Sequence, residues 1–300
     1  MAPGGRAVRT AFLGTSAFAA HVLERLAASQ HRPVLVITRP DRPRGRGRRL
    51  ASPPVAEAAR ELGIPVQQPP SVNDPASRDR LAELAPEVIC VCAFGALIKE
   101  PLLSEYRMLN VHPSLLPRWR GAAPIERAIM AGDDRTGVSI MRVTAGLDSG
   151  PVCSQAGEPI SAEDTYGSLA PRLEALGAKL LISTLDEPPV CTEQDDALAT
   201  YAEKITGADR GLDPTHPATE LERVVRALTP HIGAYVTLDG GGSLGVLAAR
   251  AVDGGPPPGI LSLDGPVPVF GCAEGSLELL TVKPPGRRAM RGEDWLRGLR

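Results

Sequence analysis

Apolar residues follow two alternating patterns in the chain up to about residue 185. Short unbroken apolar runs of strand length are followed by longer segments in which apolar residues recur every three or four positions. In the segment 17–28, Phe18, Val22 and Leu26 share one helical face. The patterns predict strands at 8–13, 34–38, 88–93, 108–112 and 138–143, and helices at 17–28, 54–62, 123–131 and 165–185.

This alternation predicts an α/β domain of the Rossmann-like kind, with a mostly parallel sheet and helices on both faces. The run at 88–93 is uninterrupted by polar residues, which is typical of a central strand covered on both sides. Ligands of open α/β sheets bind at the carboxyl ends of the strands. Residues that follow these strands are therefore the first candidates for a site.

The pattern changes after residue 185. The stretch DEPPVCTEQDD is polar and contains proline, so it predicts a connecting segment. A helix at 221–228 is followed by short β-like pieces at 234–238, 244–248 and 277–282, separated by glycine and proline clusters, which is typical of a small β-barrel. We therefore expect two domains, at 1–206 and 207–300.

Length and composition fit this organisation. A chain of 300 residues is long for one domain and fits two. Hydrophobic residues make up 43% and charged residues 23%, which favours an ordinary globular protein over a disordered or fibrous one. The net charge is −2, so a polyanionic partner would have to be held by a local basic patch.

Five cysteines are present, and none of their spacings is typical of a zinc or redox site. Two lie in the apolar run at 88–93, and Cys153, Cys191 and Cys272 are scattered. The odd count and the chain length predict reduced thiols in a cytoplasmic protein. We expect no metal, no export signal and no membrane span, since no run of about 18 apolar residues occurs.

The predicted second strand is followed by a basic run, TRPDRPRGRGRRL. Its arginines are opposed by a single acidic residue, Asp41, and its prolines and glycines disfavour a helix. Such a mobile loop can wrap a phosphate backbone, but a solvated charge run explains the composition equally well. The arginines are Arg39, Arg42, Arg44, Arg46, Arg48 and Arg49.

The first strand ends in Gly14-Thr15-Ser16-Ala17-Phe18. A glycine there permits a tight turn from strand to helix with exposed N–H groups. The sequence is not GxGxxG, so it argues against a dinucleotide site and favours a plain connecting turn.

The segment LNVHPSLLPRWRG carries the strongest chemical signal. Asn110 and His112 are two residues apart at the end of a predicted strand, so their side chains share one face. An asparagine can donate a hydrogen bond to a developing oxyanion, and a histidine exchanges protons near neutral pH. A lone histidine would more simply be a hydrogen-bonded structural residue. The neighbouring asparagine and the ligand-binding edge favour chemistry.

Asp148 lies in the glycine-bracketed loop TAGLDSG after another predicted strand. It could orient His112 or hold a water in a proton relay. Taken alone, it would be interpreted as an ordinary turn aspartate.

Together these segments resemble the folate-dependent formyltransferases, most closely the branch that acts on methionyl-tRNA. The matching segments run from the first strand nearly to the C-terminus; they are PDRPRGRGRRL, NVHPSLLPRWRGAAPIE, GLDSG, TYAEKI and PPGRRAM. The core motif is shared with relatives that act on glycinamide ribonucleotide or amino-sugar nucleotides. The basic run and the second domain favour tRNA as the acceptor.

The resemblance implies that a formyl group moves from 10-formyltetrahydrofolate, a co-substrate, to the α-amino group of methionyl-initiator-tRNA, for translation initiation. It implies an OB-like second domain, a monomer, and Asn110, His112 and Asp148 as the catalytic set. The basic loop would grip the tRNA acceptor end through Arg42, Arg44, Arg46, Arg48 and Arg49. Folate would bind beside Phe94, Gly95, Ala96, Leu97, Ile98, Ser114, Leu115, Leu116 and Pro117; for Phe94 and Leu97, simple core packing is the competing interpretation.

Three other functions stay open at this point. An amino-sugar nucleotide formyltransferase would use the same catalytic set. A non-catalytic RNA-binding module would retain the basic run without turnover, although the intact catalytic set argues against it. A nicotinamide dehydrogenase is disfavoured because the glycine fingerprint is missing.

Overall fold

The computed structural model describes residues 6–44, 49–238 and 240–299. The chain forms two compact units. The first contains residues up to 121, 136–158 and 170–201; the second contains 122–135, 159–169 and 202 onward. Each unit is described by itself below.

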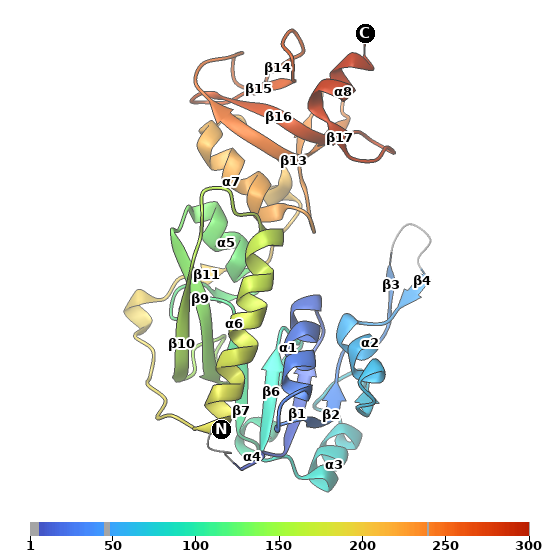
Figure 1. The fold of residues 1–300 in the computed structure, drawn as a ribbon, viewed down its shortest axis with the longest axis vertical. Helices are drawn as coiled ribbons and strands as arrows, with labels where there is room; N and C mark the ends of the chain where they lie inside the picture. The colour runs from blue at the N-terminus through green and yellow to red at the C-terminus, as the bar shows by residue number, and fades with distance from the viewer. Residues whose placement is uncertain (1–5, 45–48, 239, 300) are drawn as a thin grey trace. The chain divides into compact units, whose positions relative to one another are not determined.

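The first unit is built on a seven-stranded sheet in the order β10-β9-β7-β6-β1-β2-β5 (Figure 1). Four neighbouring pairs, β1–β2, β1–β6, β6–β7 and β2–β5, are parallel, and β9 runs antiparallel to β7. The mostly parallel sheet predicted from the alternation is thus confirmed. The strands are β1 (Thr10–Gly14), β2 (Pro33–Ile37), β5 (Val66–Gln67), β6 (Val88–Cys92), β7 (Met108–His112), β9 (Arg135–Arg142) and β10 (Val152–Pro159).

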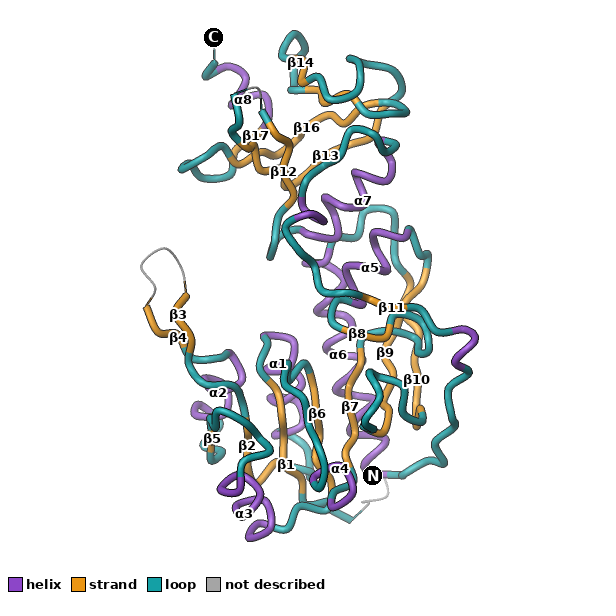
Figure 2. Tube along the Cα trace, turned by 180° about the vertical axis from the view of Figure 1, so that it is seen from behind, coloured by secondary structure: helices purple, strands orange, loops and turns teal. Residues whose placement is uncertain are grey.

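Helices cover both faces of this sheet. Alternate strand residues, such as Leu13, Ile37 and Ile89, pack in one core cluster with Leu81 of α3 and Leu102 of α4. The opposite face is covered by α1 and α6 (Figures 1 and 2). These two helices are in contact, with His21 Nδ1 lying 2.7 Å from Glu174 Oε2. Successive side chains of a strand point to opposite faces, and helices cover both faces here, so nearly every residue of β1, β2 and β6 is buried and apolar. The helices are α1 (Ala17–Ala27), α2 (Pro54–Glu61), α3 (Pro75–Leu84), α4 (Leu102–Glu105) and α6 (Tyr166–Asp186).

Gly14 is needed for this packing. A Cβ at this position would lie 2.6 Å from the Phe12 ring, 2.9 Å from the Ala19 Cβ and 2.9 Å from the Cys92 oxygen. The turn after β1 therefore brings α1 against the sheet, and the Ser16 hydroxyl caps the helix by accepting from the Ala19 amide at 3.2 Å.

Several elements of this unit were not predicted from the sequence. Helix α3 buries only Ser77 and Leu81, so its apolar periodicity is weak. Strand β10 is largely half-exposed and has no run of apolar residues. Short strands β3 (Arg42–Arg44) and β4 (Arg49–Ala51) pair antiparallel, while β8 (Arg120–Gly121), β11 (Tyr201–Ala202) and the 3-10 turn η1 (Asp196–Leu198) are too short for a pattern.

The second unit combines helices with an antiparallel sheet, in the order β12-β13-β16-β15-β14 with β17 beside β16. Its apolar core joins Leu221 and Val225 of α7 to Val246 of β13 and Leu279 of β16. The β-rich second part of the chain was predicted from its spaced strands and turns. The elements are α5 (Pro124–Ala131), η2 (Ala208–Arg210), α7 (Ala218–Leu228), β12 (Ala234–Thr237), β13 (Ser243–Val252), β14 (Leu261–Ser262), β15 (Val269–Gly271), β16 (Ser276–Lys283), β17 (Met290–Arg291) and α8 (Gly292–Arg297).

None of the helices in the described part of the chain is both long enough and apolar enough to span a membrane.

Candidate active site

The carboxyl end of β7 carries the two polar residues that the sequence singled out. Val111, between them, faces α6, where a Cβ on Gly177 would lie only 2.8 Å from its side chain. Since strand side chains alternate, Asn110 and His112 point to the opposite face. Asn110 pairs in register with Val91 of β6, which places it at the edge where β6 and β7 both end.

Asp148 reaches the same place from the loop after β9. Its Oδ1 accepts from the Asn110 Nδ2 at 3.4 Å, and its Oδ2 lies 3.6 Å from the His112 Nδ1. Oδ2 also accepts from the Gly121 amide at 2.9 Å. The structure therefore brings together an amide, an imidazole and a carboxylate that lie 38 positions apart or less in the sequence.

His112 is almost fully enclosed, with 5% of its side chain exposed. Its Nε2 lies 2.8 Å from the Trp119 carbonyl oxygen, an acceptor, so this nitrogen carries the hydrogen. The Nδ1 edge faces Asp148, whose side chain is 19% exposed. The Nδ1 edge is thus the side of the ring left for exchange with a reacting group, and the carbonyl on the other side fixes the ring orientation.

Asp148 itself and Trp119, which contacts His112, have a left-handed backbone conformation. Asp148 has a φ of 45° and Trp119 a φ of 63°. Such conformations are unfavourable for residues other than glycine and persist only where surrounding contacts hold them. Both residues contact His112, through a carboxylate and a carbonyl respectively.

The loop 93–98, expected beside folate, follows β6 at the same edge. Phe94 and Ile98 are buried and belong to the core between the sheet and α3, so core packing accounts for their side chains. Leu97 is 65% exposed, and Gly95 is exposed with a φ of 68°. Ala96 packs partly against the core. The loop therefore presents backbone and one leucine, rather than its aromatic ring, to solvent.

The second group of expected folate residues, 114–117, is packed into the fold beside His112. The Ser114 hydroxyl donates to the Arg118 oxygen at 2.6 Å, so it is engaged locally. The Leu116 amide donates to the Ser139 hydroxyl at 3.1 Å, and the Leu116 oxygen accepts from Gln155 at 2.7 Å. Leu115 and Pro117 are half-buried. These contacts fix the loop that leaves β7.

A cavity of about 320 Å³ opens at the carboxyl ends of β1, β2 and β6. It is lined by the turn after β1, by residues 39–40, 42–43 and 51–54, and by residues 93–95. The Thr15 hydroxyl donates to the Phe94 oxygen at 2.8 Å and so joins two of its walls. Thr15 and Ser16 were missed as lining residues because the turn was interpreted as a plain connection, although its place at the carboxyl edge was a usable signal.

The matches to protein families cover both parts of the chain. Residues 8–185 match the family described as formyl transferase, and residues 204–300 match formyl transferase, C-terminal domain. The chain belongs to the formyl transferase family. Methionyl-tRNA formyltransferase of Methylococcus capsulatus is 44% identical to it over 304 residues, which cover 96% of this chain and 96% of the relative.

Solved structures show the same fold at low sequence identity. An N-formyltransferase from Helicobacter canadensis, in complex with folinic acid and dTDP-3-aminofucose, superposes with a TM-score of 0.67 at 15% identity, covering 91% of this chain and 98% of that one. HypX from Aquifex aeolicus, in complex with tetrahydrofolic acid, has a TM-score of 0.65 at 15% identity, covering 97% of this chain and 47% of that one. At these identities the likeness concerns the fold alone.

The basic run of this formyl transferase chain is not an irregular loop throughout. Its flanks form the β3–β4 ribbon, with Arg42 opposite Ala51 and Arg44 opposite Arg49. A two-stranded ribbon tolerates Pro43 because one side of each strand needs no partner. Arg42 is exposed and lines the 320 Å³ cavity. Arg46 and Arg48 lie outside the described residues.

The expectation that all cysteines are reduced is wrong. Cys153 of β10 and Cys191 form a disulfide across 38 residues of sequence. The pairing follows from a local β-bridge, in which Val152 and Thr192 exchange two backbone hydrogen bonds of 2.8 Å. Such a pairing cannot be recognised from cysteine spacing, because only tertiary structure brings the two segments together.

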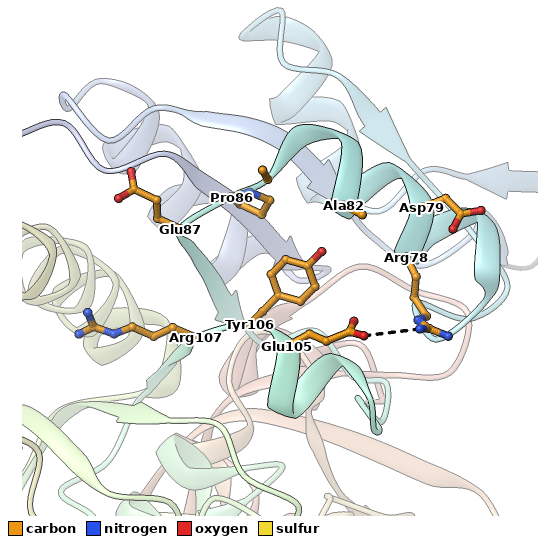
Figure 3. Close-up of a pocket in the computed structure, with 9 residues that line it drawn as sticks. Arg78, Asp79, Ala82, Pro86, Glu87, Glu105, Tyr106 and Arg107 are labelled. Carbon is orange, nitrogen blue, oxygen red and sulfur yellow. Dashed lines mark ion pairs between the residues drawn. The ribbon is translucent and has the colours of Figure 1, made fainter.

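A larger cavity of about 440 Å³ lies away from these groups (Figure 3). It is lined by residues of α3 and by Glu87 and Arg107, which directly precede β6 and β7. It thus lies at the amino ends of the strands, opposite to Asn110, and Arg78 pairs there with Glu105 at 3.6 Å. Among the described residues no cluster of three or more His, Cys, Asp or Glu side chains could hold a metal ion.

Proposed function

We propose that this formyl transferase moves a formyl group from 10-formyltetrahydrofolate to the α-amino group of methionyl-initiator-tRNA, for translation initiation. One observation carries the proposal. The Asp148 carboxylate lies within 3.6 Å of both the Asn110 amide and the His112 ring at the carboxyl edge of the sheet. The chain is 44% identical to a methionyl-tRNA formyltransferase over nearly its whole length.

The chemistry follows from the geometry of this set. The neutral amine attacks the formyl carbon, and the carbonyl oxygen becomes an oxyanion in a tetrahedral intermediate. Asn110 donates its Nδ2 hydrogen to this oxyanion; its present bond to Asp148 is 3.4 Å long, so it is easily redirected. The attacking amine, now positively charged, gives up a proton to His112 Nδ1, which Asp148 orients. This proton passes to the folate nitrogen as the nitrogen–carbon bond to folate breaks and the formyl C=O re-forms.

The folate co-substrate is placed in this proposal beside the exposed backbone of 93–98 and the loop 114–117. Ala93 and Gly95 are exposed and have left-handed φ values of 42° and 68°. A flat pterin suits such a wall, because backbone N–H and C=O groups can bind its polar edges. Phe94 and Ile98 would support the wall from behind.

The tRNA is placed on the basic segment 38–50. The chain as a whole carries a net charge of −2, so binding to a polyanion needs a local concentration of arginines. The sequence concentrates arginines in this segment, and Arg42 of β3 is exposed at the cavity on the carboxyl edge of the sheet. The set proposed to grip the acceptor end is Arg42, Arg44, Arg46, Arg48 and Arg49.

The proposed division of labour assigns chemistry to residues 1–206 and further tRNA contacts to residues 207–300. A monomer acting in the cytoplasm, where charged tRNA is used, completes the proposal. The division into two parts agrees with the separate family matches at 8–185 and 204–300.

A formylation assay tests the function directly. The purified chain is given 10-formyltetrahydrofolate with charged initiator tRNA, charged elongator methionine tRNA, or an amino-sugar nucleotide. Formylation of the initiator species in clear excess over the elongator species supports the proposal. Turnover of the amino-sugar nucleotide alone would replace it, and tRNA binding without any formyl transfer would indicate a non-catalytic RNA-binding module.

A further inference from the structure

A side-chain network outside the catalytic set holds the segment between its members. Arg120 is 3% exposed, so its guanidinium is a buried charge that needs partners. Its Nε donates to the Gln194 Oε1 at 2.9 Å, and its Nη2 lies 2.7 Å from the Asp196 carboxylate. Both partners come from a segment more than 70 residues further along the chain.

The side-chain nitrogen of Gln194 donates hydrogen bonds to the loop that carries Asp148. Its Nε2 donates to the Asp148 oxygen at 2.9 Å and to the Gly150 oxygen at 2.7 Å. One half-buried glutamine therefore connects the Arg120 guanidinium to the backbone of the loop that presents the catalytic carboxylate. This tether helps explain how Asp148 keeps its left-handed φ of 45°.

The backbone on either side of Arg120 touches both catalytic groups. The Trp119 oxygen fixes His112 Nε2 at 2.8 Å, and the Gly121 amide donates to Asp148 Oδ2 at 2.9 Å. The same stretch is held on the 194–200 segment by two bonds of 2.9 Å to Thr200, from the Trp119 and Arg120 amides. The segment itself is anchored to β10 through the disulfide at Cys191.

We infer that Gln194 and Arg120 are positioning residues for the transfer reaction, which set the distance and direction between the Asp148 carboxylate and the His112 imidazole. The inference rests on the proposed function. Neither residue touches His112 with its side chain; Gln194 acts through the loop carbonyls and Arg120 through the peptides that flank it. A displacement of about 1 Å at a reacting group can lower turnover about a hundredfold.

The substitution Gln194→Glu separates positioning from general stability. The carboxylate can still accept from Arg120, but it cannot donate to the Asp148 and Gly150 oxygens and repels them. We expect kcat to fall on the order of tenfold to a hundredfold, with little change in KM for either substrate. The pH profile of kcat should also move, since the pairing of Asp148 with His112 changes. Gln194→Met, a neutral variant of similar length, serves if the glutamate variant is poorly folded.

Gln30→Met is the matched control. Gln30 is on the surface and donates to Asp186 at 2.6 Å, on an element that the site does not use. Both the Gln194 and the Gln30 variants are compared with wild type in thermal midpoint and near-ultraviolet circular dichroism. A loss of kcat and a shifted pH profile confined to Gln194, with an unchanged midpoint, supports the inference.

A double-mutant cycle with Asp148→Asn gives the decisive comparison. If Gln194 acts by placing Asp148, then Gln194→Glu costs little further activity once the carboxylate is gone. The inference is overturned if the loss of kcat in the double variant equals the product of the losses in the two single variants. It is also overturned if Gln194→Glu keeps the wild-type kcat and pH profile. Failure of the wild-type chain to formylate methionyl-tRNA would instead reject the proposed function, so the two failures are distinguishable.

Discussion

The asparagine of the catalytic set offers the sharpest test of the mechanism. Asn110→Ala removes the donor proposed for the oxyanion. Its bond to Asp148 is long, at 3.4 Å, and the residue is half-buried, so the free energy of unfolding should fall by no more than about 1 kcal/mol. Loss of an oxyanion donor costs about a hundredfold to a thousandfold in kcat, so activity and stability should separate.

Asn110→Asp adds a second, pH-dependent measurement. Two ionised carboxylates 3.4 Å apart repel by about 5 kcal/mol at an effective dielectric constant of about 20. The pair therefore holds one proton at a pH where a single exposed aspartate would be ionised. A protonated carboxyl can donate to the oxyanion and an ionised one cannot, so the aspartate variant should exceed the alanine variant at low pH and lose that advantage as pH rises.

The assay measures kcat for formylation of charged initiator tRNA, across the pH range in which wild type stays folded. Thermal unfolding of each variant checks that the fold is retained. Near-normal turnover of Asn110→Ala would refute the role of the amide. A ratio of aspartate to alanine activity that does not change with pH would refute the proton-donor reasoning.

Three further predictions concern the rest of the chain. Replacing Arg44, Arg46, Arg48 and Arg49 by alanine should raise KM for tRNA and leave folate affinity unchanged. The slope of the logarithm of the tRNA binding constant against the logarithm of salt concentration should become shallower by about 0.7 for each phosphate group that is no longer neutralised; unchanged tRNA kinetics would make the segment merely solvated surface. Although burial opposes it, hydrogen bonds from Thr206 and the ion pair with Arg127 lower the pKa of Asp209 to about 2. Because that folded pKa is below the unfolded value of 3.8, the ionised Asp209 raises the free energy of unfolding by up to about 2 kcal/mol above pH 4, and this contribution is lost as pH falls to 2. In denaturant titrations, the free energy of unfolding of Asp209→Asn should lack this pH-dependent part. Reducing the disulfide between Cys153 and Cys191, which closes a 38-residue loop, should lower the free energy of unfolding by up to about 4 kcal/mol, and thiol titration of the denatured unreduced chain should find three free thiols; five would contradict the pairing.

That thiol count is best made on unfolded protein. Burial raises the pKa of Cys90 to about 12 and raises that of Cys92 as well, so neither thiol reacts readily in the folded state. Cys272 is also buried, and burial raises the pKa of its thiol.

Local patterns in the sequence determined most of the first unit. The central strand β6 is covered on both faces and is therefore apolar throughout, and α1 and α6 carry clear helical periodicity. Helix α3 escaped prediction because only Ser77 and Leu81 are buried, so its apolar spacing carries little signal. Asn110 and His112 could be recognised because two residues at one strand end share a face by geometry alone.

Only the tertiary structure decided what lies opposite these two residues. Asp148 lies in a loop 36 positions after His112 in the sequence, and its Oδ2 lies 3.6 Å from the His112 Nδ1. Gln194 and Arg120 are 74 positions apart, and Cys153 and Cys191 are 38 apart. A local pattern reports which side of one element is buried, but it does not report which distant segment packs there. Such contacts depend on how the strands and the segments that connect them are arranged in the folded chain. The positioning network and the disulfide therefore follow from the tertiary structure alone.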